Sequence, residues 1–360
     1  MINIDRYCVI MCGGIGSRFW PYSRTDKPKQ FIDFLGTGRS LLQMTFDRIS
    51  RVVSPDNIII VANKMYLDLI QQQLPQVRKE NILLEPARRN TAPCIAWATN
   101  HIRAINPKAS VIVAPSDHLV LREDAFERSI IHGFEFVESH DALLTLGIEP
   151  TRPETGYGYI QIGKEKYPGI SEVKTFTEKP DLELAKVFLS SGEFFWNSGI
   201  FLWSVDTIYN ALCKYAPEVM TVLDKESGVY ASAKEMDFID RNFTSCPSIS
   251  IDYAVMEKAD NVYVECVSFG WSDIGTWSAL YDNSAQDSNR NVLQNCHGMM
   301  YRSEGNMVMT ADKKVVVAVG INDYIIADAH DVLLICPKSE EQQIKHFVND
   351  VKATLGDEYL

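Results

Sequence analysis

The segment YCVIMCGGIGSRFWPYSRTDKPKQF, Tyr7 to Phe31, joins an apolar run to a glycine-rich loop and then to spaced cations. The apolar part of this segment ends at Met11 and predicts a short buried β-strand. Gly13, Gly14 and Gly16 follow it. Glycine tolerates positive φ and lets a ligand approach the main chain, so the backbone N–H groups of such a loop can hold a phosphate.

Two cations after the glycines favour a phosphate ligand. Arg18 offers a planar pair of donors that suits phosphate oxygens, and Lys29 offers a compact charge. Pro21 and Pro28 stiffen the segment between them, which fixes the reach of both side chains. Two better-known phosphate loops are excluded, because Phe19 stands where G-x-G-x-x-G needs glycine and no Gly-Lys-Ser/Thr occurs. Without the cations, the glycines fit a tight turn that binds no ligand equally well.

Short apolar runs alternate with helix-length segments in the first 150 residues. The expected strands are Tyr7–Met11, Ile58–Val61, Ser110–Ala114 and Ala142–Gly147, and the expected helices are Leu41–Val52, Met65–Leu74, Ala92–Ile105 and Ala125–Glu138. This alternation predicts βαβ units, and hence a Rossmann-like α/β domain with a mixed, mostly parallel sheet. Ligands of such sheets bind at the carboxyl ends of the strands.

The sequence pattern changes twice further along the chain. Mixed strands and loops begin at Val173, and short β-rich runs broken by polar turns begin after Ser288. We therefore predict two domains, residues 1–287 and a smaller β-rich domain at 288–360 that ends in a helix from Glu340 to Leu355.

Composition excludes several classes of protein. The net charge of −12 argues against nucleic-acid and anionic-membrane partners, and the apolar runs are far shorter than the roughly 18 residues of a spanning helix. The eight cysteines are scattered without a C-x-x-C pair, which favours a reduced, cytoplasmic setting. Residues 1–31 nevertheless hold five basic and two acidic side chains, which suits a small anionic ligand.

The loop and its cations resemble a known signature. Gly13–Pro21 matches G-G-x-G-[ST]-R-x-x-P, which is typical of the sugar-1-phosphate nucleotidyltransferases, and P-x-S-R with P-K-Q-F is similar to their mannose-1-phosphate guanylyltransferase branch. Seven further motifs occur in family order: EPARRNTAP from Glu85, PSDH from Pro115, ETGYGYI from Glu154, TEKP from Thr177, WNSGIF from Trp196, IDYAVMEK from Ile251 and GWSDIGTW from Gly270. Cys12 and Ser17 stand where alanine and threonine are commoner, and neither departure removes a group that the reaction needs.

The resemblance implies a reaction in which GTP and α-D-mannose 1-phosphate give GDP-mannose and pyrophosphate. No covalent intermediate is required, because the sugar phosphate is itself a nucleophile. The implied catalytic residues are Arg18, Lys29, Asp117 and Asp273. The two aspartates would also hold Mg²⁺, although more than 150 residues separate them. Without the family context, each fits a capping or turn aspartate better.

The remaining site residues divide between the two substrates. Nucleotide contacts are expected from Gly13, Gly14, Gly16, Ser17, Glu85, Asn90 and Thr91, and sugar-phosphate contacts from Gly156, Glu178, Lys179 and Asn197. A carboxylate at Glu85 can accept from both N1–H and the exocyclic amine of guanine. Asn90 and Thr91 fit helix capping and nucleotide contact equally well.

Three alternatives stay open at this stage. The acceptor could be glucose 1-phosphate or a heptose 1-phosphate, and the chain could be a non-catalytic regulatory relative that binds sugar nucleotides. The presence of all four implied catalytic residues disfavours that last alternative. By resemblance, the β-rich domain would be β-helix-like and would mediate a homodimer. We also expect no phosphomannose isomerase domain, because the sequence ends at Leu360 and leaves no room for one.

Overall fold

The computed structural model describes residues 3–14 and 16–360 and divides into two compact units. Unit 1 comprises Met1–Gly13, Phe46–Ser116 and Val120–Trp271, and unit 2 comprises Gly14–Thr45, Asp117–Leu119 and Ser272–Leu360. Gly14, Gly16 and the cations that follow them therefore share a compact unit with the C-terminal residues, whereas Gly13 falls in unit 1. The domain boundary after residue 287 stays a prediction.

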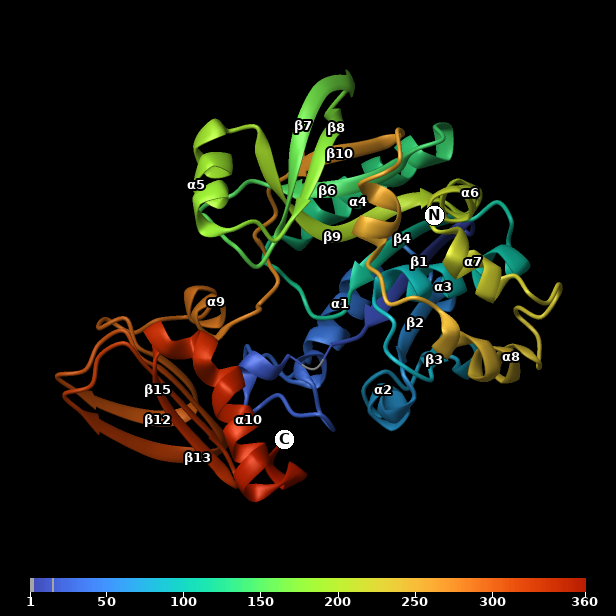
Figure 1. Cartoon of the computed structure of the whole chain (residues 1–360). Helices are drawn as coiled ribbons and strands as arrows, with labels where there is room; N and C mark the ends of the chain where they lie inside the picture. The colour runs from blue at the N-terminus through green and yellow to red at the C-terminus, as the bar shows by residue number, and fades with distance from the viewer. Residues whose placement is uncertain (1–2, 15) are drawn as a thin grey trace. The chain divides into compact units, whose positions relative to one another are not determined.

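Unit 1 contains a nine-stranded mixed sheet (Figure 1). Its strands are β1 (Arg6–Cys12), β2 (Ile58–Asn63), β3 (Ile82–Glu85), β4 (Ser110–Pro115), β6 (Leu143–Ile148), β7 (Gly158–Tyr167), β8 (Ile170–Glu178), β9 (Phe194–Ser204) and β10 (Val262–Val267), in the spatial order β3-β2-β1-β4-β9-β6-β10-β8-β7. The predicted mixed sheet is confirmed, and the four early strands lie within one or two residues of their expected bounds.

Parallel pairing is concentrated in the first half of the sheet. β3, β2, β1 and β4 run parallel, and so do β6 and β10. β9 runs antiparallel to both β4 and β6, and β7 and β8 form an antiparallel hairpin. Only Pro168 and Gly169 separate β7 from β8, and Gly169 has a φ of 76°. So short a connection closes a hairpin, whereas a parallel pair needs a long crossover.

The helices are α1 (Leu41–Ile49), α2 (Leu67–Gln73), α3 (Thr91–Ile105), α4 (Glu123–Ser139), α5 (Leu182–Ser191), α6 (Val205–Tyr215), α7 (Pro217–Leu223) and α8 (Glu235–Asn242). α3 packs against α6 and α7, and α4 packs against β4, β6 and β9. A buried carboxylate holds α3 to α8, because Glu235 accepts from Trp97 Nε1 at 2.7 Å and contacts His101 Nδ1 at 2.8 Å. Three donors satisfy this carboxylate, the third being the N–H of Ala231 at 2.8 Å.

Unit 2 contains a four-stranded sheet in the order β12 (Val292–Tyr301), β13 (Met307–Val319), β14 (Tyr324–Ala329) and β15 (Val332–Pro337). The first three strands pair in parallel and β15 closes the sheet antiparallel to β14. Helices α9 (Trp277–Asp282) and α10 (Ile344–Leu355) complete the unit, and a 3₁₀ turn at Lys338–Gln343 precedes α10. Two-residue strands β5 (Leu119–Val120) and β11 (Trp271–Ser272) fall at unit boundaries.

The cation-bearing segment is built into the core of unit 2. Phe19, Trp20, Ile32 and Phe34 belong to the same buried cluster as side chains of α9, β12–β15 and α10. Buried asparagines pin successive turns of the β-rich part, since Asn306 donates to Asn291 Oδ1 at 2.9 Å and to the carbonyl of Ile321 at 2.9 Å. The parallel rungs and this asparagine ladder are consistent with the predicted β-helix-like domain.

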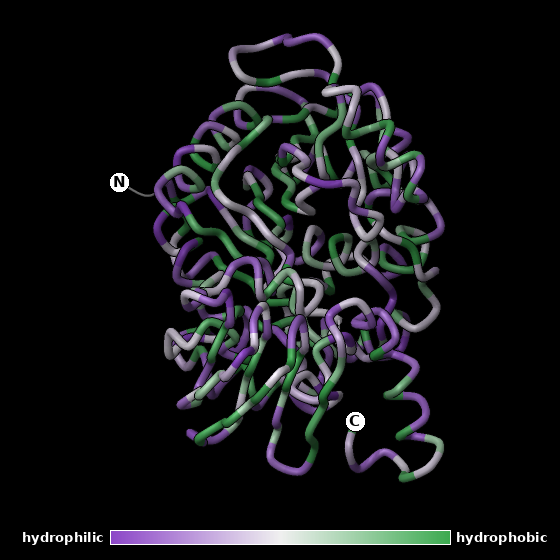
Figure 2. Tube along the Cα trace, turned by 90° about the vertical axis from the view of Figure 1, so that its left-hand side faces the viewer, coloured by the Kyte–Doolittle hydropathy of each residue, from purple (hydrophilic) through white to green (hydrophobic). Residues whose placement is uncertain are grey.

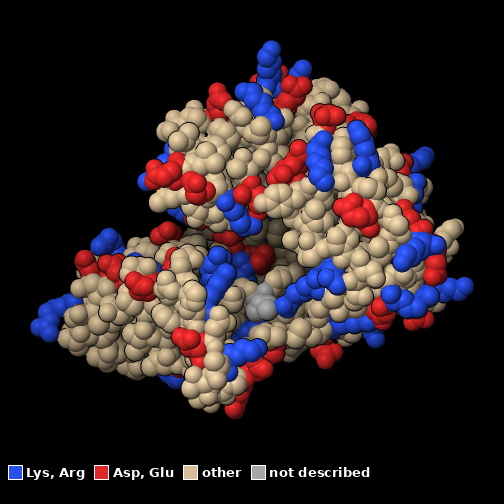
Figure 3. Space-filling model, in the orientation of Figure 1, with Lys and Arg blue, Asp and Glu red and all other residues tan. Residues whose placement is uncertain are grey.

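Hydropathy and charge fit a protein with a buried core and a mixed surface. Figure 2 shows hydrophobic and hydrophilic stretches interspersed along the chain, and both kinds of residue occur in the helix next to the C-terminus. Acidic and basic side chains are interspersed over the face drawn in Figure 3. Among the described residues, no helix combines the length and apolar character needed to cross a membrane.

Candidate active site

A buried ammonium group organises the predicted phosphate and metal residues of unit 2. Lys29 is 7% exposed, and its Nζ lies 3.0 Å from Asp117 Oδ2. The same nitrogen donates to the carbonyls of Asp273 at 2.7 Å and Ile274 at 3.0 Å. Asp117 and the adjacent pair Asp273 and Ile274, which lie in segments distant in sequence, therefore meet at one nitrogen.

The carboxylate of Asp117 is held in its charged form. Burial opposes ionisation, but the charge of Lys29, the neighbouring His118 and hydrogen bonding together lower the pKa of Asp117 below its usual value. His118 Nε2 lies 3.8 Å from Asp117 Oδ1. Asp117 is consequently ionised at neutral pH and available to a cation.

Two glycines of the loop have structural reasons to be glycine. Gly14 and Gly16 have φ angles of 87° and 66°. A Cβ on Gly16 would lie 3.0 Å from both Cβ and Cγ of Lys29, so this glycine lets the main chain pack against the lysine stem. Gly13 shows neither constraint, and its role in nucleotide binding stays a prediction. Ile15 lies outside the described residues.

Arg18 lies in the 3₁₀ turn Ser17–Phe19 that follows Gly16. Its Nε is buried and has no hydrogen-bond partner among the described residues. An unsatisfied buried donor on a charged group costs free energy, so an anionic ligand would stabilise it. Contacts of Ser17 and Arg18 with a nucleotide stay predictions.

The loop that carries Asp273 is strained. Ile274 has a φ of 39°, which is rare for a β-branched residue, and its carbonyl accepts from Lys29. The Asp273 carboxylate accepts from the N–H of Gly275 at 2.9 Å, and a Cβ on Gly275 would lie 2.6 Å from Asp273 Oδ2. The conformation of this loop therefore sets the position of the aspartate.

Asp117 and Asp273 suit a hard divalent ion. Mg²⁺ commonly takes one or two protein carboxylates and completes its shell with phosphates and water. Within the part of the chain that the structure describes, no group of three or more His, Cys, Asp or Glu forms a ready-made metal cage. An ion shared between two aspartates and a phosphate fits this donor set.

In unit 1, Glu85 at the end of β3 has an unused acceptor. Its side chain is 8% exposed, and its Oε1 is buried without a hydrogen-bond partner among the described residues. Burial raises the pKa of Glu85 to about 7, although Cys94 and Arg88 act in the opposite direction. A ligand that donates hydrogen bonds here would both satisfy the oxygen and favour the ionised form.

Asn90 and Thr91 both have structural partners. Asn90 caps α3 at a φ of 65°, and its side-chain oxygen accepts from the N–H of Thr91 at 2.9 Å. Thr91 Oγ1 accepts from the N–H of Ile251 at 2.8 Å and so ties α3 to the segment that precedes Asp252. Capping is shown for Asn90, and nucleotide contact stays a prediction for both residues.

Two of the predicted sugar residues, Glu178 and Asn197, lie next to Gly158, a glycine that the sequence analysis did not single out. A Cβ on Gly158 would lie 2.6 Å from Glu178 Oε2 and 3.4 Å from Asn197 Cβ. Lys179, at a φ of 48°, forms an ion pair with Glu178. Gly156 has only the end of the Glu154 side chain near its Cβ position, and its sugar role stays a prediction.

Asp252 is a second residue that the sequence analysis did not single out. It accepts a 2.7 Å hydrogen bond from Asn197 Nδ2, and burial followed by the nearby charge of Glu178 raises its pKa to about 6. It begins the π-helical turn Asp252–Met256, a type of irregularity often found at functional sites. Its place in the IDYAVMEK motif was the available signal.

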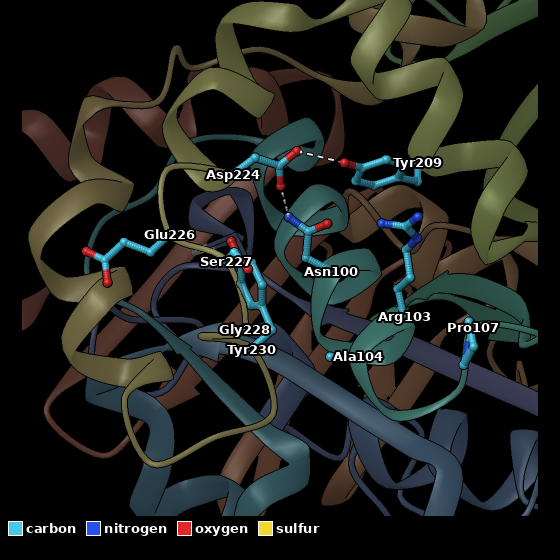
Figure 4. A pocket seen from close by; sticks show the side chains of 10 residues that line it. All are labelled: Asn100, Arg103, Ala104, Pro107, Tyr209, Asp224, Glu226, Ser227, Gly228 and Tyr230. Atoms are coloured by element: carbon cyan, nitrogen blue, oxygen red, sulfur yellow. Dashed lines mark hydrogen bonds between the residues drawn. The ribbon is translucent and has the colours of Figure 1, made fainter.

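A separate hollow in unit 1, of about 430 Å³, contains none of the predicted site residues. Figure 4 shows that Asp224 joins its two sides, accepting from Asn100 Nδ2 at 2.9 Å and from the hydroxyl of Tyr209 at 3.0 Å. Arg103 stacks over the Tyr209 ring at 4.0 Å and bonds to Asp206. These partners give the polar groups of the hollow a structural role.

Comparison with known families identifies the class of protein. The family model described as nucleotidyl transferase matches residues 7–290, and the model described as MannoseP isomerase/GMP-like beta-helix domain matches residues 303–351. The chain therefore belongs to the nucleotidyl transferase family and carries a C-terminal β-helix-like domain. This confirms the predicted fold class and the prediction that the protein is a nucleotidyltransferase enzyme.

Individual relatives indicate which nucleotidyltransferases this chain resembles. Proteins named mannose-1-phosphate guanylyltransferase from Escherichia coli (strain K12) and Klebsiella pneumoniae are each 37% identical over 98% of this chain and 75% of their own length. A Thermus thermophilus structure described as a mannose-1-phosphate geranyltransferase is 30% identical, with a TM-score of 0.87 over 97% of this chain and 99% of that one. A Helicobacter pylori structure described as a mannose-6-phosphate isomerase is 27% identical, with a TM-score of 0.59 over 74% of this chain and 99% of that one. The predicted resemblance to the mannose-1-phosphate guanylyltransferases is confirmed.

Replacing Asp252 by Asn should change how stability depends on pH. A carboxyl whose folded pKa is raised stabilises the fold below its unfolded value of 3.8 and loses that contribution as pH rises to about 6. Asp252→Asn removes the ionisation but keeps an oxygen to accept from Asn197. Between pH 4 and pH 7, the free energy of unfolding of the variant should rise relative to that of the wild type by about 2–3 kcal/mol, at roughly 1.4 kcal/mol per pKa unit.

Urea denaturation at several pH values measures this difference, and Asp260→Asn, at an exposed aspartate, is the control. Parallel stability profiles for Asp252→Asn and the wild type would contradict the assignment of a raised pKa.

Proposed function

We propose that this protein transfers GMP from GTP to α-D-mannose 1-phosphate and releases pyrophosphate. The observation that carries the choice of nucleotide is the buried Oε1 of Glu85, which has no hydrogen-bond partner in the described part of the chain. Guanine presents N1–H and an exocyclic amine on one edge, which a carboxylate accepts together, whereas adenine lacks the N1–H. The names of the relatives support mannose 1-phosphate as the acceptor.

The phosphate end of GTP would be neutralised by Arg18 and Lys29. An oxygen of mannose 1-phosphate attacks the α-phosphorus, the bond from that phosphorus to the bridging oxygen breaks, and pyrophosphate leaves with the bonding electrons. The sugar phosphate is the nucleophile, so the protein needs to supply alignment and charge rather than a covalent intermediate.

Asp117 and Asp273 would hold Mg²⁺, which when bound neutralises charge on the phosphates. Lys29 pairs with Asp117 at 3.0 Å and contacts the main chain of Asp273. One lysine thus positions both carboxylate-bearing loops and keeps the Asp117 carboxylate ionised. That arrangement supports a role for Lys29 in both catalysis and site assembly.

The acceptor would be bound by the cluster around Gly158. Glu178 and Asn197 can hydrogen-bond sugar hydroxyls, and Asp252 holds Asn197 through its 2.7 Å contact. Lys179 would hold the 1-phosphate; its side chain is 62% exposed and so is accessible to a ligand. A cytoplasmic location and a homodimer remain predictions from the sequence analysis.

A substrate panel tests the proposed function. GTP, ATP, UTP and dTTP are each combined with mannose, glucose and heptose 1-phosphates in the presence of Mg²⁺, and pyrophosphate release and the sugar nucleotide are measured. We expect the GTP and mannose 1-phosphate pair to exceed every other pair by at least tenfold in kcat/KM, and chelation of the metal to abolish transfer. Preference for another sugar would overturn the acceptor, and no transfer from any pair would support a regulatory relative.

The raised pKa of Glu85 predicts a pH-dependent KM for GTP. Guanine donates to the ionised carboxylate, and below pH 7 the free enzyme increasingly carries the protonated form, so the KM for GTP should rise as pH falls from 8 to 5.5. Glu85→Gln should raise the KM for GTP at pH 8 by roughly tenfold or more and flatten its pH dependence.

Steady-state kinetics at fixed, saturating mannose 1-phosphate measure this effect, with Glu80→Gln at an exposed position as the control. A KM for GTP that stays constant in the wild type, or that varies equally in Glu85→Gln, would remove Glu85 from base recognition.

A further inference from the structure

The C-terminal helix of unit 2 brings a lysine next to the arginine of the phosphate loop. Helix α10 packs against the turn Ser17–Phe19, which carries Arg18. Lys345 is the second residue of α10 and follows Ile344, which is fully buried. Segments more than 300 residues apart in sequence therefore contact each other beside Arg18.

Apolar packing fixes α10 in this position. Ile344, Val348 and Val351 recur at helical spacing and pack in one cluster with Phe19 and Trp20, which flank Arg18 in the sequence. Trp20 Nε1 also donates to the carbonyl of Tyr359 at 2.7 Å. Hydrophobic contacts and a hydrogen bond thus attach the loop to the end of the chain. They hold the backbone of Lys345 close to the turn that carries Arg18.

The electrostatics of this contact are unfavourable without a ligand. The charge of Arg18, followed by partial burial, lowers the pKa of Lys345. Within the described residues, neither Arg18 nor Lys345 forms an ion pair, and Arg18 Nε is buried without a partner.

The other lysines near these segments are neutralised. Lys29 pairs with Asp117 at 3.0 Å, Lys338 with Asp323 at 3.0 Å and Lys352 with Asp357 at 2.7 Å. The acidic Glu341, four residues before Lys345, accepts from the N–H of Ser278 at 2.9 Å. Arg18 and Lys345 are therefore two cations close enough for their charges to interact, and an anion bound between them would relieve this repulsion.

We propose that Lys345 joins Arg18 in binding the terminal phosphates of the nucleoside triphosphate, so that the β-rich C-terminal part of the chain supplies a ligand-binding residue. This inference rests on the proposed function, because the anion it assigns is the part of GTP that leaves as pyrophosphate. Negative charge builds on that group as its bond to the α-phosphorus breaks. A cation at Lys345 stabilises the leaving group and the free pyrophosphate, but makes no contact with the α-phosphate or the base.

Calorimetric binding of inorganic tripolyphosphate, pyrophosphate and GMP, each with Mg²⁺, tests the assignment on the full chain. Lys345→Ala should lower the affinity for tripolyphosphate and for pyrophosphate about tenfold. Its affinity for GMP should stay within twofold of the wild-type value. Lys345→Arg should restore most of the affinity, because it keeps the charge. Lys352→Ala, on the same helix, is the matched control and should bind all three probes as the wild type does.

Three outcomes overturn the inference: tripolyphosphate that does not bind the wild type, equal affinity in Lys345→Ala, or equal weakening in Lys352→Ala. Thermal unfolding of each variant shows whether a loss of binding reflects a loss of fold, and a folded Lys345→Glu variant should bind tripolyphosphate more weakly than Lys345→Ala. Failure of the proposed function is distinct, since the substrate panel would show no guanylyl transfer while tripolyphosphate binding still depended on Lys345.

Discussion

The phosphate side of the proposed site depends on the contacts made by the buried ammonium of Lys29. It reaches Asp117 and two carbonyls of the loop that carries Asp273, all within 3.0 Å. Several backbone features follow from this arrangement. Gly16 must lack a side chain because the lysine stem lies against it, and Ile274 is held at a φ of 39° while its carbonyl accepts from Lys29. Local strain at this place is offset by a charge-assisted hydrogen-bond network.

Three carboxylates lie in different environments, and these environments suit the different roles proposed for them. Asp117 faces Lys29, which keeps its pKa low and the group ready for a cation. Glu85 is buried, and one of its carboxylate oxygens has no hydrogen-bond partner among the described residues. Burial raises its pKa to about 7, so a ligand that donates a hydrogen bond would favour its ionised form. Asp252, with a pKa of about 6, accepts from Asn197 and thereby orients a residue of the proposed sugar site. Burial and neighbouring charge thus give the same chemical group three proposed roles, which are binding a metal, recognising a base and positioning an amide.

Local sequence patterns were sufficient to predict much of the fold and part of the candidate site. The apolar run of β1 followed by Gly14 and Gly16 predicted a strand and a loop with positive φ angles, because both depend on nearby residues alone. The antiparallel course of β9 and the placement of Gly14–Thr45 with the C-terminal residues depend on packing between distant segments, which periodicity does not encode. Gly158 and Asp252 stand in the ETGYGYI and IDYAVMEK motifs, but their roles depend on contacts with Glu178 and Asn197 that the motifs do not reveal.

The proposed role of Lys29 is that of the organising cation in a transfer that is catalysed by fixed charge. Its most direct test is the turnover number of Lys29→Met, which keeps the length of the apolar stem, measured beside the exposed Lys27→Met at saturating GTP and mannose 1-phosphate. We expect a fall in kcat of at least two orders of magnitude for Lys29→Met, with thermal unfolding still cooperative, and near-normal turnover for Lys27→Met. A folded Lys29→Met variant with a kcat close to that of the wild type would contradict it.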